Sequence, residues 1–401
     1  MKDDIFNELQ NPNESKILLV VLDGLGGLAD ESGKTELESA VKPNMDRLAA
    51  HYETGEMVPV DIGITPGSGP GHLGVFGYEP TDYIIGRGIL EALGLNLKVD
   101  KETVTVRCNF ATIDSERIIT DRRAGRISSD ENQRLVKILN DRIKSIDGRQ
   151  VEFYAGKEHR FVMVIRGVNG AADVNDTDPQ ETGKQILKAE PQNQSSSETA
   201  EIINKATDQI LDTLKAEKKA NAALFRGISK MPEIPTMKKK YMLNPCCIAT
   251  YPMYKGLATL VGMDILHTKE TIADQIETLK ANYDKYDFFF LHVKKTDSYG
   301  EDGNYKAKVK VIEEFDAMLP EIEKMKFDAM AITADHSTPS VMMAHSYHTV
   351  PLLLVNSRPR LSDVKSFSER ECLRGAIGRI YSKQLMSLLL ASTGRLKKFG
   401  A

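Results

Sequence analysis

The chain has 401 residues, of which 41% are hydrophobic and 27% charged, and its formal net charge is -4. A chain of this length can form a large core and is expected to form two domains. The slightly acidic balance excludes a general basic surface for nucleic acid, although a local basic pocket for an anion is compatible with it.

Neither a membrane segment nor a signal peptide is predicted. The first residues, MKDDIFNELQNPNES, are polar, and no apolar run approaches the roughly 20 residues needed to cross a bilayer. The four cysteines contain no C-x-x-C pair. Reduced thiols in a cytoplasmic protein are therefore the simplest interpretation, and we expect no membrane partner.

The first predicted element is a buried strand, the unbroken apolar run ILLVVL at 17–22, which ends at Asp23. A glycine-rich loop, TPGSGPGHLGVFG, follows at 65–77 and contains Ser68. Glycines let the backbone approach a ligand closely, and the apolar residues after the loop could begin a helix. Ser68 would then lie at a helix N-terminus, which is a favourable anion site. The alternative is a flexible loop with an unreactive serine.

The middle of the chain has shorter predicted strands and two amphipathic helices. Two prolines at 231–235 indicate a hinge. We interpret residues 83–235 as a domain inserted between two parts of a core domain, 1–82 and 236–401. Its arginine-rich segments, DRRAGR and LFRG, could bind phosphate or carboxylate, because guanidinium groups bind both in a bidentate manner.

Apolar runs return late in the chain, at 287–293, 329–333 and 350–355, with helical spacing between them. Strands that alternate with helices predict a mainly parallel sheet in an α/β fold. Potential metal ligands lie at the edges of these runs: Asp23, Asp297, Asp335, His336 and His345. Ligands of such sheets bind at the carboxyl ends of the strands, and carboxylates with imidazoles suit Zn²⁺ or Mn²⁺ better than Ca²⁺. Each residue alone could instead be a turn, a helix cap or a buried histidine.

Six segments together resemble one family, the cofactor-independent phosphoglycerate mutases of the archaeal type. They are LDGLGGLAD, GKTELESAVKPNMDRLA, TPGSGPGHLGVFGYEP, IIGRGILEALG, TADHSTP and HSYHTVP. The resemblance implies an alkaline-phosphatase-like core with an inserted α+β substrate domain. It also implies an isomerase that interconverts 3-phosphoglycerate and 2-phosphoglycerate through a phosphoserine, with two divalent metals and without 2,3-bisphosphoglycerate. Manganese is the expected metal, with zinc, magnesium or cobalt as alternatives.

The resemblance also implies roles for individual residues. Ser68 would be phosphorylated. One metal would be surrounded by four residues, namely Asp23, Ser68, Asp335 and His336. Asp297 and His345 would hold the second metal. Lys255 would assist phosphoryl transfer. In the inserted domain the resemblance favours four residues for binding the small phosphorylated substrate: Asp121, Arg122, His159 and Arg226.

Two departures from the family pattern leave part of the site open. Family members commonly carry a histidine four residues after the aspartate of the second metal, whereas this chain has Glu301. Glutamate can replace a histidine ligand, but it changes the charge of the site. The serine loop reads SGPGH, whereas archaeal members often read SDTAH.

Three alternatives remain open. The nearest is a phosphomonoesterase or phosphonate hydrolase of the same superfamily, because the core motifs do not distinguish hydrolases from mutases. The second is an inactive paralogue with a binding role, against which the retention of Ser68 argues. The third is a kinase-like role on homoserine, which the lack of a G-x-x-x-x-G-K-[ST] loop weakens. The sequence does not determine the oligomeric state.

Overall fold

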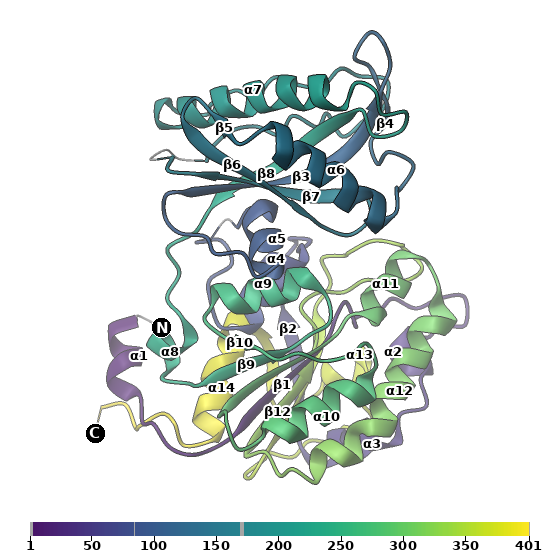
Figure 1. The fold of residues 1–401 in the computed structure, drawn as a ribbon. Coiled ribbons are helices and arrows are strands. Elements are labelled where there is room, and N and C mark those ends of the chain that lie inside the picture. The colour runs from purple at the N-terminus through teal and green to yellow at the C-terminus, as the bar shows by residue number, and fades with distance from the viewer. Residues whose placement is uncertain (1–2, 84, 169–171, 401) are drawn as a thin grey trace. The chain divides into compact units, whose positions relative to one another are not determined.

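The computed structural model describes residues 3–83, 85–168 and 172–400. The chain divides into two compact units, one formed by Met1–Ile84 with Ile234–Ala401 and the other by Ile85–Glu233. The borders expected from the sequence lie at 82/83 and 235/236. Each unit has its own sheet and its own helices (Figure 1).

The larger unit contains an eight-stranded sheet with the order β10-β9-β11-β1-β12-β13-β2-β14. Strand β1 lies between β11 and β12 and is parallel to both, whereas β13 is antiparallel to β12 and β2. All residues of β1 are buried, as expected of an unbroken apolar run. The strands are β1 (Ile17–Leu22), β2 (Glu53–Val58), β9 (Pro245–Ile248), β10 (Asp264–Ile265), β11 (Phe288–Val293), β12 (Ala329–Thr333), β13 (Val350–Asn356) and β14 (Gly378–Tyr381).

Helices cover both faces of this sheet. On one face, Phe290 of β11 contacts His72 of α4. The neighbouring residue Phe289 points to the opposite face and stacks on Tyr283 at the end of α10. The helices are α1 (Asp3–Leu9), α2 (Glu36–Ser39), α3 (Pro43–His51), α4 (Ser68–Val75), α8 (Met237–Tyr241), α9 (Pro252–Leu260), α10 (Ile272–Asn282), α11 (Lys295–Glu301), α12 (Tyr305–Glu323), α13 (Glu369–Cys372), η2 (Ser382–Gln384) and α14 (Leu385–Ser392).

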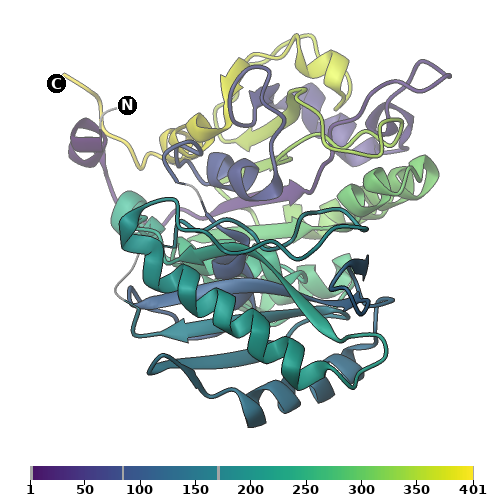
Figure 2. The ribbon, with the colours of Figure 1, turned by 90° about the horizontal axis from the view of Figure 1, so that it is seen from above.

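The smaller unit has an antiparallel sheet of order β4-β3-β7-β6-β5, and β8 also pairs with β3. Helices α6 and α7 contribute to one buried core on one face of this sheet (Figures 1 and 2). Helix α5 packs against the other face through Ala92. The elements are α5 (Arg87–Gly94), β3 (Thr103–Ile113), β4 (Ile119–Asp121), α6 (Ser129–Arg142), β5 (Ser145–Ile146), β6 (Arg149–Ala155), β7 (Arg160–Arg166), η1 (Gln194–Ser196), α7 (Ser197–Leu214) and β8 (Ala222–Lys230).

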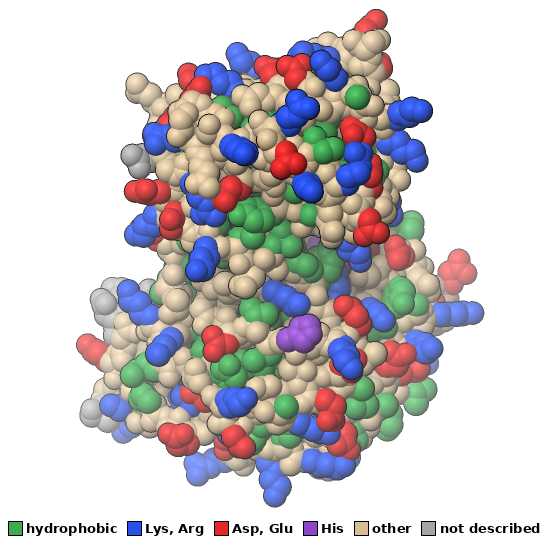
Figure 3. All heavy atoms as spheres, in the orientation of Figure 1, with side chains coloured by type: hydrophobic (Ala, Val, Ile, Leu, Met, Phe, Trp, Pro, Cys, Tyr) green, Lys and Arg blue, Asp and Glu red, His purple; other side chains and the backbone are tan. Residues whose placement is uncertain are grey.

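The predicted α/β class is therefore confirmed, with a mainly parallel core sheet and an α+β unit inserted into the core sequence. Within the described residues, no helix is both long enough and apolar enough to span a bilayer. On the face drawn in Figure 3, acidic and basic side chains are interspersed on each unit. This mixture agrees with the small net charge.

Candidate metal centre and serine loop

The candidate ligands of the larger unit lie at one edge of its sheet. Asp23 directly follows β1, Asp335 and His336 closely follow β12, and Asp297 lies in the first turn of α11 after β11. These three strands are parallel, so their carboxyl ends share an edge. Because β13 runs in the opposite direction, the segment before it, with His345, reaches the same edge.

Asp23, Asp335 and His336 form a first ligand group, whose ligand atoms lie within 4.8 Å of one another. Nε2 of His336 lies 3.3 Å from Oδ1 of Asp23 and 3.2 Å from Oδ2 of Asp335. All three side chains are buried. Oδ1 of Asp23 has no hydrogen-bond partner in the described part of the chain, although buried carboxylate oxygens are normally satisfied. A divalent cation fits this set of nitrogen and oxygen donors.

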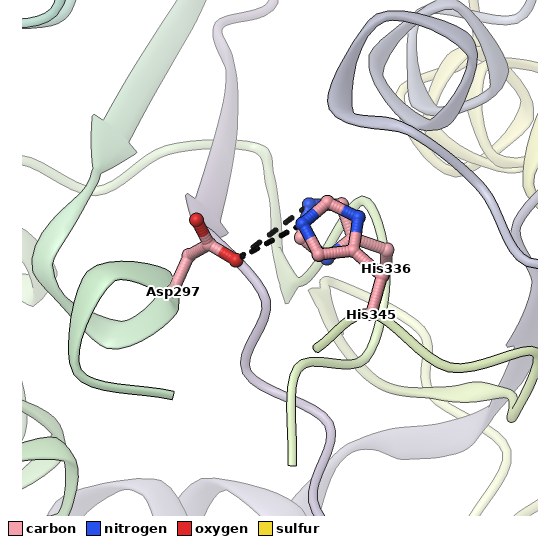
Figure 4. A group of neighbouring side chains, drawn as sticks. All are labelled: Asp297, His336 and His345. Carbon is pink, nitrogen blue, oxygen red and sulfur yellow. Dashed lines mark ion pairs between the residues drawn. The ribbon is translucent and has the colours of Figure 1, made fainter. Parts of the chain in front are cut away.

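Asp297, His336 and His345 form a second ligand group, which shares His336 with the first. Oδ1 of Asp297 lies 3.5 Å from Nε2 of His345 and 4.0 Å from Nε2 of His336. The two imidazoles stack with their centroids 3.7 Å apart, and both point toward the carboxylate (Figure 4). Nδ1 of His345 donates to the carbonyl oxygen of Pro66 at 2.8 Å. This bond leaves Nε2 as the nitrogen available to a metal.

The charges around these groups keep the carboxylates of Asp23 and Asp297 ionised. Burial by itself raises the pKa of Asp297, but a hydrogen bond from His345 and the charge of Lys294 lower it to about 2. Burial likewise opposes the charged form of His345, and its hydrogen bonds to Asp297 and Pro66 raise its pKa to about 9. The pKa of Asp23 is also held well below its ordinary value, against burial, chiefly by Lys294. Ionised carboxylates are the form that a metal requires.

Two other predicted residues lie farther from these groups. Glu301 is 56% exposed, and its Oε1 lies 3.7 Å from Nε2 of His345, so it stands at the rim of the second group. Lys255 is half-buried on α9, next to Tyr254, whose hydroxyl donates to Asp23. Within the described residues, the Lys255 ammonium forms no ion pair with a candidate ligand.

Ser68 begins α4, as expected from the apolar residues that follow the loop, and Gly67 is the N-cap. The Ser68 hydroxyl lies 3.3 Å from Nε2 of His336. A Cβ atom at Gly71 would lie 2.4 Å from the carbonyl oxygen of Asp335. Glycine at this position therefore lets the helix approach the first ligand group closely. The N-terminal N–H groups of α4 favour an anion beside Ser68.

Lys294 and Thr338 support the ligands but were not singled out in the sequence. The Lys294 ammonium lies 3.0 Å from Oδ2 of Asp23 and also pairs closely with Oδ2 of Asp297. The Thr338 hydroxyl donates to Oδ1 of Asp297 at 2.7 Å and lies 3.0 Å from Nδ1 of His336. Lys294 is one of two adjacent lysines, which look like a solvated pair, whereas Thr338 lies in the quoted TADHSTP motif.

A buried layer of aromatic and histidine side chains lies behind the first group. Nδ1 of His72 lies 2.9 Å from Oδ2 of Asp335. Tyr254 stacks on His292 with centroids 3.8 Å apart, and the hydroxyl of Tyr254 donates to Asp23. The spacing of His72, four residues after the serine on a predicted helix, could have placed it beside the site.

The predicted substrate residues all lie in the smaller unit. Arg122 binds both oxygens of the buried Asp178, with distances of 2.9 and 2.7 Å. Nε of Arg226 lies 3.8 Å from the same carboxylate and 3.5 Å from Asp176. These carboxylates therefore hold the two predicted arginines close together. Asp121 accepts from two backbone N–H groups of its own loop, so its carboxylate shapes the loop.

His159 is only 3% exposed. Burial and the nearby charge of Arg160 lower its pKa to about 4, so the imidazole is neutral at pH 7. Arg123 adds to the positive charge around it. A buried neutral imidazole among arginines can donate or accept a hydrogen bond without adding charge.

Further basic and polar residues of the smaller unit share one face of its sheet. On β3, Arg107 is opposite Arg226 of β8, and Asn109 is opposite Arg160 of β7. This face is turned away from the core formed with α6 and α7, because the alternate residues of β3 supply that core. Nε of Arg107 lies 2.9 Å from Oε1 of Glu91 on α5. The face thus concentrates positive charge.

Comparison with known proteins gives relatives that align along nearly the whole chain. A probable 2,3-bisphosphoglycerate-independent phosphoglycerate mutase of Aquifex aeolicus is 52% identical over 406 residues, with 99% of this chain and 100% of the relative covered. The chain belongs to this family. A relative of the same name in Thermus thermophilus is 49% identical, with 99% of both chains covered. The family profile, 2,3-bisphosphoglycerate-independent phosphoglycerate mutase, matches residues 49–220.

Solved structures agree with the family. A Pyrococcus horikoshii protein has a TM-score of 0.82 at 29% identity, covering 98% of this chain and 100% of its own. The cofactor-independent phosphoglycerate mutase of Thermoplasma acidophilum has a TM-score of 0.70 at 28% identity, covering 94% and 100%. The family resemblance predicted from the motifs is confirmed. As a phosphoglycerate mutase, the chain is an isomerase, an intramolecular phosphotransferase.

Proposed function

We propose that this chain interconverts 3-phosphoglycerate and 2-phosphoglycerate through a phosphoserine at Ser68, without 2,3-bisphosphoglycerate. The observation that carries this proposal is the position of the Ser68 hydroxyl. It lies at the N-terminus of α4 and 3.3 Å from His336, which belongs to both ligand groups. A serine needs such an environment because its free hydroxyl is a weak nucleophile.

The proposal assigns two divalent ions to these groups. Ser68 and the first group (Asp23, Asp335 and His336) would hold one ion. Asp297 and His345 would hold the other, with Glu301 completing the set from the rim. Bound divalent ions supply Lewis-acid stabilisation of phosphoryl oxygens and lower the pKa of a coordinated hydroxyl. Manganese is the proposed metal, with zinc, magnesium or cobalt as alternatives for the same donors.

The chain's own residues would carry out the transfer. The Ser68 oxygen attacks phosphorus, and the bond from phosphorus to the glycerate oxygen breaks. Ser68 loses its hydroxyl proton, and the released glycerate oxygen gains one. In the second step the neighbouring hydroxyl of glycerate attacks the phosphoserine and restores Ser68. The N–H groups at the start of α4 favour the negative charge of the phosphoryl group in both steps. Lys255 is proposed to assist the transfer.

Between the two steps glycerate must stay bound, and water must not reach the phosphoserine. We assign the retention of glycerate to the predicted residues of the smaller unit, Asp121, Arg122, His159 and Arg226. The pairing of Arg122 and Arg226 around Asp178 supports this assignment, because it prearranges two guanidinium groups. The neighbouring Arg107 adds positive charge. Exclusion of water distinguishes a mutase from a phosphatase.

A cytoplasmic location is part of the proposal. The four cysteines are free and buried, in keeping with a reducing compartment. The proposed substrate is a small phosphorylated metabolite.

One assay tests the proposed reaction. The pure protein is chelated, then given Mn²⁺ and 3-phosphoglycerate without 2,3-bisphosphoglycerate, and 2-phosphoglycerate and free phosphate are followed together. We expect 2-phosphoglycerate as the main product and no activity before Mn²⁺ is added. Free phosphate as the main product would instead favour the phosphomonoesterase alternative. Full activity after exhaustive chelation would rule out the two-metal proposal.

Ser68→Ala tests the nucleophile. The change removes one hydroxyl from a polar site, so the fold should persist while mutase and phosphatase activities both disappear. Circular dichroism would check the fold. Substantial turnover by this variant would mean that another group accepts the phosphoryl group.

A further inference from the structure

Lys294 lies between the two ligand groups. It follows β11 directly and is the N-cap of α11, whose first turn carries Asp297. Its ammonium lies 3.0 Å from Oδ2 of Asp23, in the first group, and pairs closely with Oδ2 of Asp297, in the second. One side chain therefore links carboxylates that come from two different strand ends.

The two carboxylates present their oxygens in the same way. Oδ1 of Asp23 faces His336 at 3.3 Å, and Oδ1 of Asp297 faces His345 at 3.5 Å. We call these the inner oxygens, since they face the imidazoles that would share the metals. The outer oxygens, Oδ2 of each residue, both contact Lys294. The ammonium thus leaves the inner oxygens available.

The burial of Asp23 and Asp297 makes their carboxylates depend on the positive charge of Lys294. Asp23 and Asp297 are 0% and 1% exposed, and the Lys294 side chain is 19% exposed. A buried carboxylate that loses its cation is strongly unfavourable, because burial penalises an unpaired charge. The ammonium also lies over the rings of Tyr251 and Tyr254, 5.8 and 5.4 Å from their centroids. These rings favour a cation at this place.

We propose that Lys294 is a positioning residue, a built-in counter-ion that binds the outer oxygens of Asp23 and Asp297 and so holds the two ligand groups together. The structural part of this inference is independent of any metal. Its metal-binding part rests on the proposed function.

The Lys294 ammonium stabilises the chelated protein but opposes the binding of metal ions. A fixed ammonium repels divalent ions held by the same carboxylates, because like charges a few ångströms apart interact unfavourably. Removing the Lys294 charge should therefore destabilise the chelated protein and make the protein gain more from a divalent metal. A purely structural side chain would lower stability equally with and without metal.

The test measures thermal midpoints of the full chain in chelator and in saturating Mn²⁺, for the wild type and for Lys294→Met. In chelator we expect the midpoint of the variant to fall by roughly 5 °C or more. The upward shift on adding Mn²⁺ should be larger in the variant than in the wild type. Lys295→Met is the matched control, since Lys295 is the adjacent, exposed lysine. Its midpoints should stay within about 2 °C of the wild type.

Lys294→Gln separates charge from hydrogen bonding, because glutamine keeps a donor and loses the cation. The counter-ion role predicts that Lys294→Gln behaves like Lys294→Met. If Lys294→Met does not fold, the midpoints of Lys294→Gln test the counter-ion role instead. A variant that folds only with Mn²⁺ also supports the proposal. A variant midpoint equal to that of the wild type in chelator overturns the proposal. So does a Mn²⁺ shift of the variant no larger than a measurable Mn²⁺ shift of the wild type. If Mn²⁺ raises the thermal midpoint of neither the wild type nor the variants, the two-metal proposal fails. The comparison of midpoints in chelator still tests the structural role of Lys294.

Discussion

Glu301 is the residue at which this chain departs from the histidine common in its family. Its carboxylate lies 3.7 Å from Nε2 of His345 and is 56% exposed. If Glu301 is a ligand of the second ion, Glu301→Ala should weaken one of two Mn²⁺ sites by about tenfold or more and leave the other unchanged. Calorimetric titration of the chelated protein with Mn²⁺ measures both sites.

Glu301→His is the matched control, because it introduces the usual family residue at the same place. It should retain two sites of comparable affinity. Unchanged Mn²⁺ binding in Glu301→Ala would show that Glu301 is only a carboxylate of the loop.

His159 provides a test in the smaller unit. Burial and Arg160 lower its pKa to about 4, below the ordinary value of about 6.5. Between these values the unfolded chain binds the proton more readily than the folded one. The contribution of neutral His159 to stability is therefore complete above about pH 6.5 and is lost progressively as the pH falls toward about 4.

NMR titration of labelled histidine rings would measure this pKa directly, with His159→Gln used to assign the signal. We expect a midpoint near 4. The wild type should also lose more thermal stability than His159→Gln between pH 7 and pH 5. A midpoint near 6.5 would mean that the imidazole is solvated.

Site residues can be predicted from the sequence where a potential ligand directly follows a predicted strand. Residues whose role depends on a partner far away in the sequence are missed. Asp23 and Asp335 stand out because each follows an apolar run that could only be a buried strand. Lys294 follows such a run as well, but it resembles any surface lysine until Asp23 is known to lie beside it. His292 is hidden inside the apolar run FFFLHV.

Among the elements, β13 shows where strand patterns are insufficient. Its apolar sequence predicts a strand but not a direction. In the structure β13 is antiparallel to β12, and this direction brings its beginning to the carboxyl ends of β1, β11 and β12. His345 precedes β13 and can meet Asp297 only for this reason. A parallel β13 would put His345 at the opposite edge of the sheet.

Helix α4 allows a test of how closely an element must pack. A methyl group at Gly71 would lie 2.4 Å from the carbonyl oxygen of Asp335, which cannot move without moving the ligand. Gly71→Ala should therefore shift Ser68 away from the first group and lower kcat/KM by about a hundredfold.

Gly67→Ala adds the same methyl group at the N-cap of the same helix, where its nearest neighbour, Cδ of Pro70, is 3.9 Å away. The backbone of Gly67 is also in the ordinary extended region. This control should keep its activity within about threefold, since the added methyl group is in ordinary contact and displaces neither Ser68 nor a candidate ligand. Equal losses in both variants would show that the packing of Gly71 is not critical.

At the scale of the whole molecule, the proposed division of labour predicts a change in product. Loss of one contact from a guanidinium to a charged group costs about 1.5–3 kcal/mol, or roughly tenfold to a hundredfold in retention. Arg226→Ala should therefore lower mutase turnover more than hydrolysis of a small aryl phosphate, and the ratio of free phosphate to 2-phosphoglycerate should rise.

Arg117→Ala is a control in the same unit, since the Arg117 side chain is 66% exposed and forms an ion pair with the exposed Asp208. It should leave the product ratio unchanged. If Arg226→Ala lowers mutase turnover and aryl phosphate hydrolysis in equal proportion, Arg226 does not retain glycerate.

The strand order of the larger unit also determines when the chain can fold as it leaves the ribosome. Strand β1 ends at residue 22, yet its neighbours β11 and β12 begin at residues 288 and 329. All strands of the smaller unit lie between residues 103 and 230, so that unit can complete its sheet first. During synthesis β1 therefore stays without its final partners while about two-thirds of the chain is made. An apolar strand in this condition is prone to aggregate, and a chaperone that binds the nascent N-terminal segment would protect it.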